Sequence, residues 1–324
     1  MHSLINPAVI RAELALKNKS LSTIADQVKS VYEDWHGQPE RFFFFKLNQQ
    51  EYCGQKLISP LVFECQAPTL FCSHIKMDML LGLVLRTQCS EGGVRIFYKT
   101  LSLAQRHAIF ETLLQDRMID LYFPFVHLNK DHHAELTSPE QGWVIDEETA
   151  NFLARGEAMQ VEVSLELLRE DAHPAPVIYD PACSTGHFLY ALKQSIPTAT
   201  VIGQDLSQSM CDRARPLLDQ VIHGDAFCPE ISYASCDYIF FRFLNAEVVN
   251  TETAMTLFKA IIPCLKPTGK AILFGFTPVL IALPELMQQG FRTLACNAAH
   301  VTEGTLIQYY VISPAAGLDL PQQR

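Results

Sequence analysis

The stretch that decides the fold is VIYDPACSTGHFL, residues 177–189. Its apolar start ends in an acid at Asp180, small residues follow as far as Gly186, and a helical pattern begins at His187. A strand, a tight loop and a helix start occur in this order in nucleotide-binding βαβ units. Small residues let the loop backbone approach a ligand closely, and the N–H groups at the helix start can hydrogen-bond an anionic group.

Strands and helices alternate after this loop. Strands are predicted at 177–179, 200–203, 220–223, 236–241 and 270–276, with a final antiparallel pair at 291–296 and 305–313. Helices are predicted at 187–194, 206–218, 253–265 and 284–289. This alternation is typical of a parallel sheet that helices cover on both faces. Asp205 ends the second strand, 25 residues after Asp180 (205 − 180), where an acid suits hydrogen bonds to ribose hydroxyls.

The N-terminal half has a different pattern. Helices are predicted over 3–19, 21–36, 75–87 and 102–121, and a short strand over 94–98. We therefore predict a mostly helical cap at residues 1–145, acting as lid and substrate pocket, and a nucleotide-binding domain at residues 146–324. Four consecutive phenylalanines, Phe42–Phe45, are interpreted as a core strand or helix turn, with an aromatic wall over a ligand as the alternative.

Composition limits the partners. The 324 residues carry a formal net charge of −10 and no Lys/Arg block, which disfavours a nucleic-acid partner. Ten cysteines are scattered singly, so we expect reduced thiols. His127, His132 and His133 are interpreted as a solvated loop and not as a metal site. With no signal pattern at the start and no apolar run long enough for a bilayer, we expect a cytoplasmic protein without metal or membrane partner, with a homodimer as a possible assembly.

Six short segments then occur in a recognisable order. They are DPACSTG at 180–186, GQDLS at 203–207, GDA at 224–226, CDYI at 236–239, LKPTGK at 265–270 and GF at 290–291. Together they resemble the class I S-adenosylmethionine (SAM)-dependent methyltransferases over roughly residues 145–313. The resemblance implies an α/β, Rossmann-like fold with a seven-stranded mixed sheet whose last strand is antiparallel. It also implies SAM as cosubstrate.

The resemblance also assigns roles by position. The first loop would hold the methionyl part of SAM, through Asp180, Ala182, Cys183, Ser184, Thr185, Gly186 and His187. Asp205 would bind the ribose and Asp225 would accept a hydrogen bond from the adenine amino group. The adenine ring would lie between Leu206, Met210, Ala226 and Phe227. Ala182, Cys183 and Ser184 stand where the family commonly has glycine, so the loop is expected to approach its ligand less freely.

The turn after the fourth predicted strand narrows the substrate class. The loop start also resembles adenine-N6 DNA methyltransferases, but those need Asn/Asp-Pro-Pro-aromatic after that strand, and this chain has FFRFLN at 240–245. A small-molecule substrate is therefore expected. The candidate catalytic residues are Phe241, Arg242, Phe243 and Asn245 in this turn, and Tyr32 and Trp35 in the lid, to which Phe42–Phe45 are added as lid aromatics.

Three functions stay open from the sequence. The first is methyl transfer from SAM to a small molecule in secondary metabolism, in which acceptor, carbon and sulfur must be held in line. The second is SAM cyclisation, in which the amine of SAM attacks its own γ-carbon and yields azetidine-2-carboxylate and methylthioadenosine. The third is SAM binding without catalysis.

Overall fold

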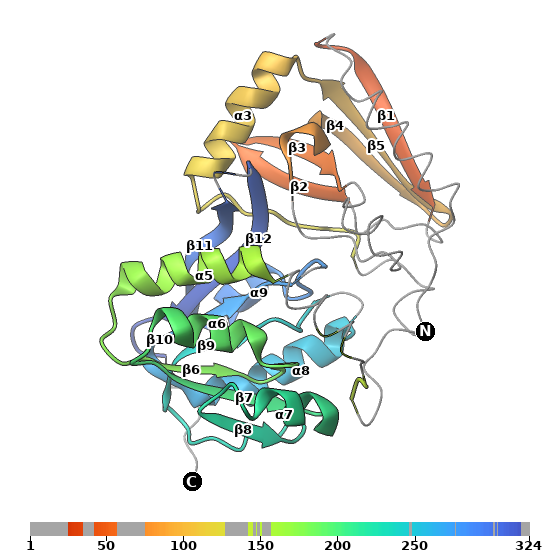
Figure 1. Ribbon diagram of the computed structural model, residues 1–324. Coiled ribbons are helices and arrows are strands. Elements are labelled where there is room, and N and C mark those ends of the chain that lie inside the picture. Colours follow the sequence, from red (N-terminus) through yellow and green to blue (C-terminus); the bar gives the residue numbers. More distant parts are fainter. Residues whose placement is uncertain are drawn as a thin grey trace. The chain divides into compact units, whose positions relative to one another are not determined.

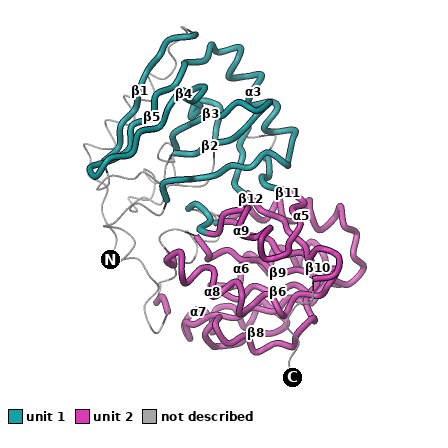
Figure 2. Tube along the Cα trace, turned by 180° about the vertical axis from the view of Figure 1, so that it is seen from behind, with its two compact units in different colours: residues 1–135, 275–280, 296–308 teal, residues 136–274, 281–295, 309–324 magenta. Residues whose placement is uncertain are grey.

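The computed structural model describes residues 25–34, 42–56, 75–126, 142–144, 147, 150, 157–245, 248–275, 277–300, 302 and 304–318 (Figure 1). The chain divides into two compact units (Figure 2). Unit 1 comprises residues 1–135, 275–280 and 296–308, and unit 2 comprises residues 136–274, 281–295 and 309–324. The chain thus returns to unit 1 twice, at residues 275–280 and 296–308. The prediction of two consecutive domains did not include these two segments. The predicted boundary at residue 145 itself stays a prediction.

Unit 2 is built on a seven-stranded sheet with the strand order β11-β12-β10-β9-β6-β7-β8 (Figure 1). The strands are β6 Val177–Asp180, β7 Thr200–Asp205, β8 Gln220–His223, β9 Cys236–Phe241, β10 Leu265–Leu273, β11 Phe291–His300 and β12 Thr305–Pro314. Residues 296–300 of β11 and 305–308 of β12 belong to unit 1. Strands β10, β9, β6, β7 and β8 pair in parallel, and β12 pairs antiparallel with β10. The predicted mixed sheet with an antiparallel last strand is therefore confirmed.

The strand order places the first loop at a switch point. The chain builds β6, continues to β7 and β8 on one side, and then crosses to β9 and β10 on the other. In open α/β sheets a ligand binds at the carboxyl ends of the strands where the order reverses in this way. In this sheet that position is the end of β6, at Asp180.

Short helices connect the strands of unit 2. They are α6 His187–Ser195, α7 Gln208–Ala214, α8 Thr251–Ile261 and α9 Leu283–Gln288, with a 3-10 turn, η3, at Ile262–Cys264. A longer helix, α5 Ala158–Asp171, precedes β6. The four predicted helices that follow the first loop are present, with ends shifted by a few residues. Every residue of β9 is buried, as expected for a central parallel strand covered on both faces.

Unit 1 is a five-stranded antiparallel sheet with the order β1-β5-β4-β3-β2. The strands are β1 Val28–Asp34, β2 Phe42–Leu47, β3 Gln50–Gln55, β4 Leu80–Ser90 and β5 Gly93–Thr100. The 3-10 turn η2 Met77–Met79 directly precedes β4, and helix α3 Leu103–Gln115 follows β5. The prediction of a mostly helical cap is therefore wrong. The helix predicted over 21–36 contains β1, and the helix predicted over 75–87 contains η2 and most of β4. The strand predicted over 94–98 and the helix predicted over 102–121 are present.

The misassigned segment at β4 has an identifiable cause. Its apolar run, LLGLVL at 80–85, does not distinguish a buried helix from a strand. Pairing with β5 makes this run a strand. The two strands lie so close that a Cβ at Gly82 would be 2.1 Å from the backbone oxygen of Lys99. Only glycine lets these two strands approach so closely. That constraint comes from a residue 17 positions away along the chain (99 − 82).

The four phenylalanines of β2 form core on both faces of the unit 1 sheet. All are 0–2% exposed. Phe44 packs in the cluster of Phe42, Cys53, Val94, Ile96, Tyr98 and Phe125. On the other face Phe43 contacts Phe123, and Phe45 stacks on Tyr52. The interpretation as a core strand is confirmed, and these rings are not an open wall over a ligand.

Several predictions fall on parts of the chain outside the described residues. They are the helix at 3–19, Trp35, and the loop histidines at 127, 132 and 133. Among the residues that the structure does describe, no helix is long and apolar enough to span a bilayer.

Candidate cofactor-binding site

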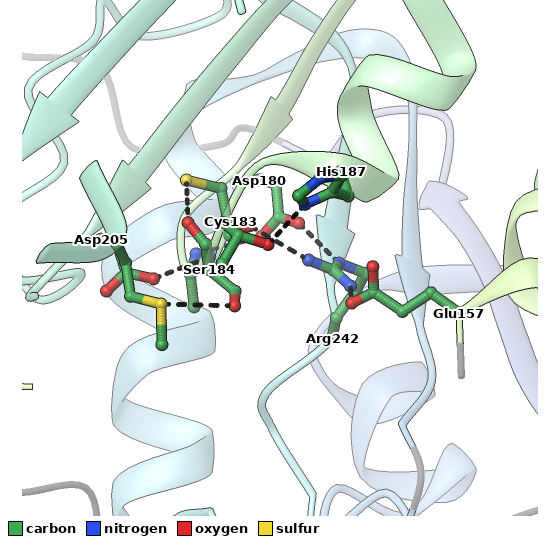
Figure 3. Close-up of polar contacts among 10 residues, drawn as sticks. Glu157, Asp180, Cys183, Ser184, His187, Asp205 and Arg242 are labelled. Atoms are coloured by element: carbon green, nitrogen blue, oxygen red, sulfur yellow. Dashed lines mark hydrogen bonds and ion pairs between the residues drawn. The ribbon is translucent and has the colours of Figure 1, made fainter. Parts of the chain in front are cut away.

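The loop after β6 is a closed turn organised by Asp180 (Figure 3). The Asp180 carboxylate accepts the N–H of Ala182 at 3.0 Å. The N–H of Cys183 donates to the carbonyl of Gln204 in β7 at 2.8 Å, and the N–H of Gly186 donates to the carbonyl of Cys183 at 3.0 Å. The loop therefore lies directly beside the carboxyl end of β7.

Non-glycine residues in this loop are accommodated in two ways. The Cys183 side chain is 1% exposed and fills space left by a glycine in β7: a Cβ at Gly203 would lie 2.6 Å from its Sγ. Burial, followed by the charge of Asp180, raises the pKa of the Cys183 thiol well above its usual value, so it stays neutral. Ser184 takes the left-handed conformation itself, with φ at +53°, and Gly186 has φ at +79°. The bulk that replaces glycine at Cys183 thus points into the core of unit 2.

Asp205, at the end of β7, is held against this loop. Its two carboxylate oxygens accept the N–H groups of Ser184 at 2.8 Å and of Ser207 at 2.9 Å. Burial raises the pKa of Asp205, and the bonds from Ser207 and Ser184 offset part of that rise. The carboxylate therefore sits where the loop and the start of α7 meet, as the sequence spacing predicted.

The second predicted nucleoside acid lies at the same edge of the sheet. Asp205 pairs with His223 in the parallel ladder, and the N–H of Gly224 donates to the carbonyl of Asp205 at 3.0 Å. Asp225 follows directly; it is exposed, and one of its carboxylate oxygens accepts the N–H of Phe227 at 2.9 Å. The two acids therefore end neighbouring strands.

The four residues predicted to surround adenine lie around these strand ends and differ in exposure. Met210 is 4% exposed and receives a hydrogen bond from the Ser184 hydroxyl to its sulfur at 3.7 Å. Phe227 is 42% exposed, so it is not a core residue. Leu206 and Ala226 are half-buried. Their role toward adenine stays a prediction.

Arg242, directly after β9, is part of a buried charged network (Figure 3). Its Nε donates to Asp180 at 2.6 Å and its Nη1 to Glu157 at 2.5 Å. Its guanidinium also lies 4.5 Å over the ring centre of Phe188. Burial alone would lower the pKa of Arg242, but Asp180 and Glu157 raise it above the ordinary value, so it remains charged. Arg242 therefore forms its ion pairs in the interior of unit 2 and not on the surface.

This network defines Asp180 as the organiser of the loop. Asp180 is completely buried, and its two oxygens accept bonds from Ala182 and Arg242. Glu157, just before α5, was not identified from the sequence. It lies 85 residues before Arg242, and no local motif marks it. Only the tertiary contact could have revealed it.

The other candidate catalytic residues fall in two groups. Phe241, Phe243 and Asn245 are 0%, 9% and 3% exposed, and Phe241 packs on Phe243 and Phe258 with ring centres 6.5 and 5.3 Å apart. Tyr32 lies in unit 1, where its hydroxyl donates to the carbonyl of Gly92 at 3.0 Å. The ring contacts of Phe241 and the hydrogen bond of Tyr32 are packing and turn contacts. The catalytic roles of both groups stay predictions.

His187 begins α6 and is tied to the loop. One ring nitrogen lies 2.8 Å from the hydroxyl of Thr185, which is 3% exposed (Figure 3). The ring is therefore not simply turned out to solvent. Within the described part of the chain, no group of three or more His, Cys, Asp or Glu side chains is arranged to hold a metal ion.

Comparison with known proteins agrees with this geometry. Residues 178–269 match a family model described as a methyltransferase domain. Isonocardicin synthase of Nocardia uniformis subsp. tsuyamanensis is 34% identical over 291 residues, which cover 89% of this chain and 95% of that protein. The chain belongs to the class I SAM-dependent methyltransferase family. SAM binding is implied by this family's fold.

Two solved structures are also similar over part of the chain. The magnesium protoporphyrin IX methyltransferase of Synechocystis PCC 6803 is 16% identical, with 54% of this chain and 86% of that chain covered and a TM-score of 0.40. The sugar N-methyltransferase KedS8 of Streptoalloteichus sp ATCC 53650 is 22% identical, with 43% and 57% covered and a TM-score of 0.35.

Proposed function

We propose that this chain is an enzyme that transfers a carbon group of SAM in small-molecule secondary metabolism. One observation carries the proposal: the Asp205 carboxylate is bound by the Ser184 N–H of the first loop and is adjacent, through Gly224, to Asp225. Asp205 and Asp225, the two acids proposed to bind the nucleoside, are thereby held beside the loop at 180–186, which would hold the amino-acid end of the same ligand.

The residues present fit the adenosyl part of SAM. Each carboxylate oxygen of Asp205 accepts one N–H and has a further lone pair for a ribose hydroxyl. Asp225 is exposed and has a carboxylate oxygen available for the adenine amino group. Leu206, Met210 and Phe227 offer apolar surface for the flat ring. This donor and acceptor set suits a nucleoside.

The charge of the site favours a sulfonium. Asp180 and Glu157 both pair with the guanidinium of Arg242, and Asp205 adds a third carboxylate against the same loop. The sulfur of SAM is positively charged, whereas the sulfur of methylthioadenosine or S-adenosylhomocysteine is neutral. A surplus of negative charge in a partly buried site therefore binds the substrate more tightly than the product.

SAM supplies two carbons that a small-molecule nucleophile can attack, the methyl carbon and the γ-carbon. We favour the γ-carbon. The relative that matches nearly the whole chain, N-terminal unit included, is named as a synthase of a small molecule and not as a methyltransferase. Attack by an external acceptor would move the aminocarboxypropyl group, and attack by SAM's own amine would give azetidine-2-carboxylate. Both routes release methylthioadenosine.

Methyl transfer is the second candidate, supported by the methyltransferase-domain match over residues 178–269. In all three routes the chain's own part is the same: the loop and the two acids fix the sulfonium, and Arg242 holds the loop in place. The rate gain then comes from holding nucleophile, carbon and sulfur in line.

Product analysis by mass spectrometry separates these reactions. The purified chain is incubated with SAM alone and with SAM plus a panel of phenols, amines and carboxylates, with Asp205→Ala as the matched inactive control. Methylthioadenosine without acceptor indicates cyclisation, methylthioadenosine only with acceptor indicates aminocarboxypropyl transfer, and S-adenosylhomocysteine indicates methyl transfer. SAM binding by calorimetry without any product would favour a binding protein, and absence of SAM binding would overturn the proposal.

A further inference from the structure

A segment that precedes the matched family domain lies on the start of α7. The backbone carbonyl of Trp143 accepts the hydroxyl of Ser207 at 2.6 Å and that of Ser209 at 3.4 Å. Gly142 has φ at +74°, and a Cβ there would lie 2.6 Å from the backbone nitrogen of Ser207. The segment therefore rests directly on Ser207, at an approach that only glycine permits.

This contact reaches the proposed ribose acid in one step. Ser207 uses its hydroxyl for Trp143 and its N–H for the carboxylate of Asp205, at 2.9 Å. The backbone of Trp143 is thus connected to Asp205 by two hydrogen bonds through Ser207.

Two residues that are connected to the acids by short steps carry large exposed aromatic side chains. Trp143, linked to Asp205, is 38% exposed, and Phe227, two residues after Asp225, is 42% exposed. Exposed aromatic surface at a polar site is typical of ligand-binding positions, where the ligand covers it. Adenine has a flat face that stacks on such rings.

We propose that Trp143 binds the adenine ring of SAM and, with Phe227, supplies the aromatic surface of the adenosyl site. The inference rests on the proposed function, because it requires SAM at Asp205 and Asp225. It adds a binding residue from outside residues 178–269, the part of the chain that the family model matches. The indole contacts only the adenosyl part, so it contributes equally to binding SAM and methylthioadenosine.

Tryptophan fluorescence tests the inference directly, because the chain has two tryptophans, Trp35 and Trp143. Stacking of adenine on an indole changes its emission. SAM titration is therefore expected to quench the wild type and the Trp35→Phe variant, while Trp143→Phe shows no ligand-dependent signal although calorimetry still detects SAM. Quenching that survives in Trp143→Phe and disappears in Trp35→Phe would overturn the assignment.

Affinity supplies a second readout. Trp143→Ala is expected to raise the Kd of SAM and of methylthioadenosine alike by about tenfold, and Trp143→Phe by less, because a ring remains. Circular dichroism and the melting temperature should match the wild type, since the side chain is partly exposed. Unchanged affinity in Trp143→Ala overturns this inference alone. A wild-type protein that binds no SAM overturns the proposed function, and this inference with it.

Discussion

Strand β2 of unit 1 and strand β6 of unit 2 use burial for different purposes. The four phenylalanines of β2 pack on other apolar and aromatic side chains. Strand β6 ends in a buried carboxylate, Asp180, whose partners are a backbone N–H and the guanidinium of Arg242. An apolar core tolerates other apolar side chains of similar volume. A buried charge, in contrast, is stable only with an oppositely charged partner in the right position. The difference indicates that the chemistry of this protein is organised around β6 and its neighbours.

Removing the guanidinium should have the largest effect. Arg242→Ala leaves Asp180 buried and without its ion-pair partner, so the free energy of unfolding should fall by about 3–5 kcal/mol and SAM binding should be lost. Urea unfolding and calorimetry measure the two effects. Arg242→Lys keeps the charge but lacks the two-sided fork, so it should recover part of each. If Arg242→Ala lowered the free energy of unfolding by less than about 1 kcal/mol and still bound SAM, the buried ion pair at β6 would not have the importance assigned to it here.

Truncating a phenylalanine in β2 should damage stability without affecting the cofactor. Phe44 is 2% exposed and contacts Tyr122 and Phe125 with ring centres 5.8 and 5.7 Å apart. Phe44→Ala should lower the free energy of unfolding by about 3 kcal/mol, while the Kd of SAM on the folded protein stays within about twofold. Phe44→Leu, which keeps most of the volume, should cost about 1 kcal/mol. A large change in SAM affinity would show that unit 1 takes part in cofactor binding.

The same contrast explains which parts of the fold could be predicted from sequence. In unit 2 the strands β6 to β9 are short, mostly apolar runs that end at or just before an acid, a glycine or a turn, and the helices α6 and α8 are amphipathic. The pattern from Val177 to His187 therefore predicts strand, loop and helix from local residues. Asp205 could be placed because parallel strands bring their carboxyl ends to one edge.

In unit 1 the deciding contacts are distant in sequence. Strand β1 pairs with β5, with Val28 opposite Lys99, and its apolar residues also fit a helical spacing. In the site itself, the ion pair of Glu157 with Arg242 joins residues 85 positions apart. The hydrogen bond from Ser207 to the Trp143 carbonyl joins residues 64 positions apart. Patterns in a single sequence do not reveal such pairs, because neither residue belongs to a motif that predicts its partner.

The pKa of Asp205 offers a subtler test of the charged site. Burial raises this pKa above the ordinary value. The protonated acid offers fewer acceptor sites to the ribose hydroxyls and no negative charge to the sulfonium. The affinity for SAM should therefore fall as the pH is lowered through a value above 3.8, the ordinary value for aspartate. Asp205→Asn should bind SAM about tenfold more weakly at pH 7 and lose this pH dependence, as isothermal calorimetry from pH 4.5 to pH 8 would show.

The sign for stability is opposite to that for binding. The folded state holds the Asp205 proton more tightly than the unfolded chain does, so this group's contribution is full below 3.8 and is lost as the pH rises through the raised pKa. Asp205→Asn should therefore remove a slope in which the free energy of unfolding decreases with rising pH. An unchanged pH profile of SAM affinity in Asp205→Asn would assign the titration to another group.

The smallest expected effect concerns the loop's departure from its family pattern. Ser184 has φ at +53°, a conformation that costs a side chain about 1 kcal/mol and costs glycine nothing. Ser184→Gly removes this strain, while the loss of the weak hydroxyl bond to the Met210 sulfur and the greater freedom of the unfolded chain offset part of the gain. A net rise of at most about 0.5 kcal/mol in the free energy of unfolding is therefore expected. Ala182→Gly, at a position without positive φ, should instead lose a similar amount. If thermal unfolding shows both variants to be destabilised, the serine side chain itself stabilises the loop, and the strain argument fails there.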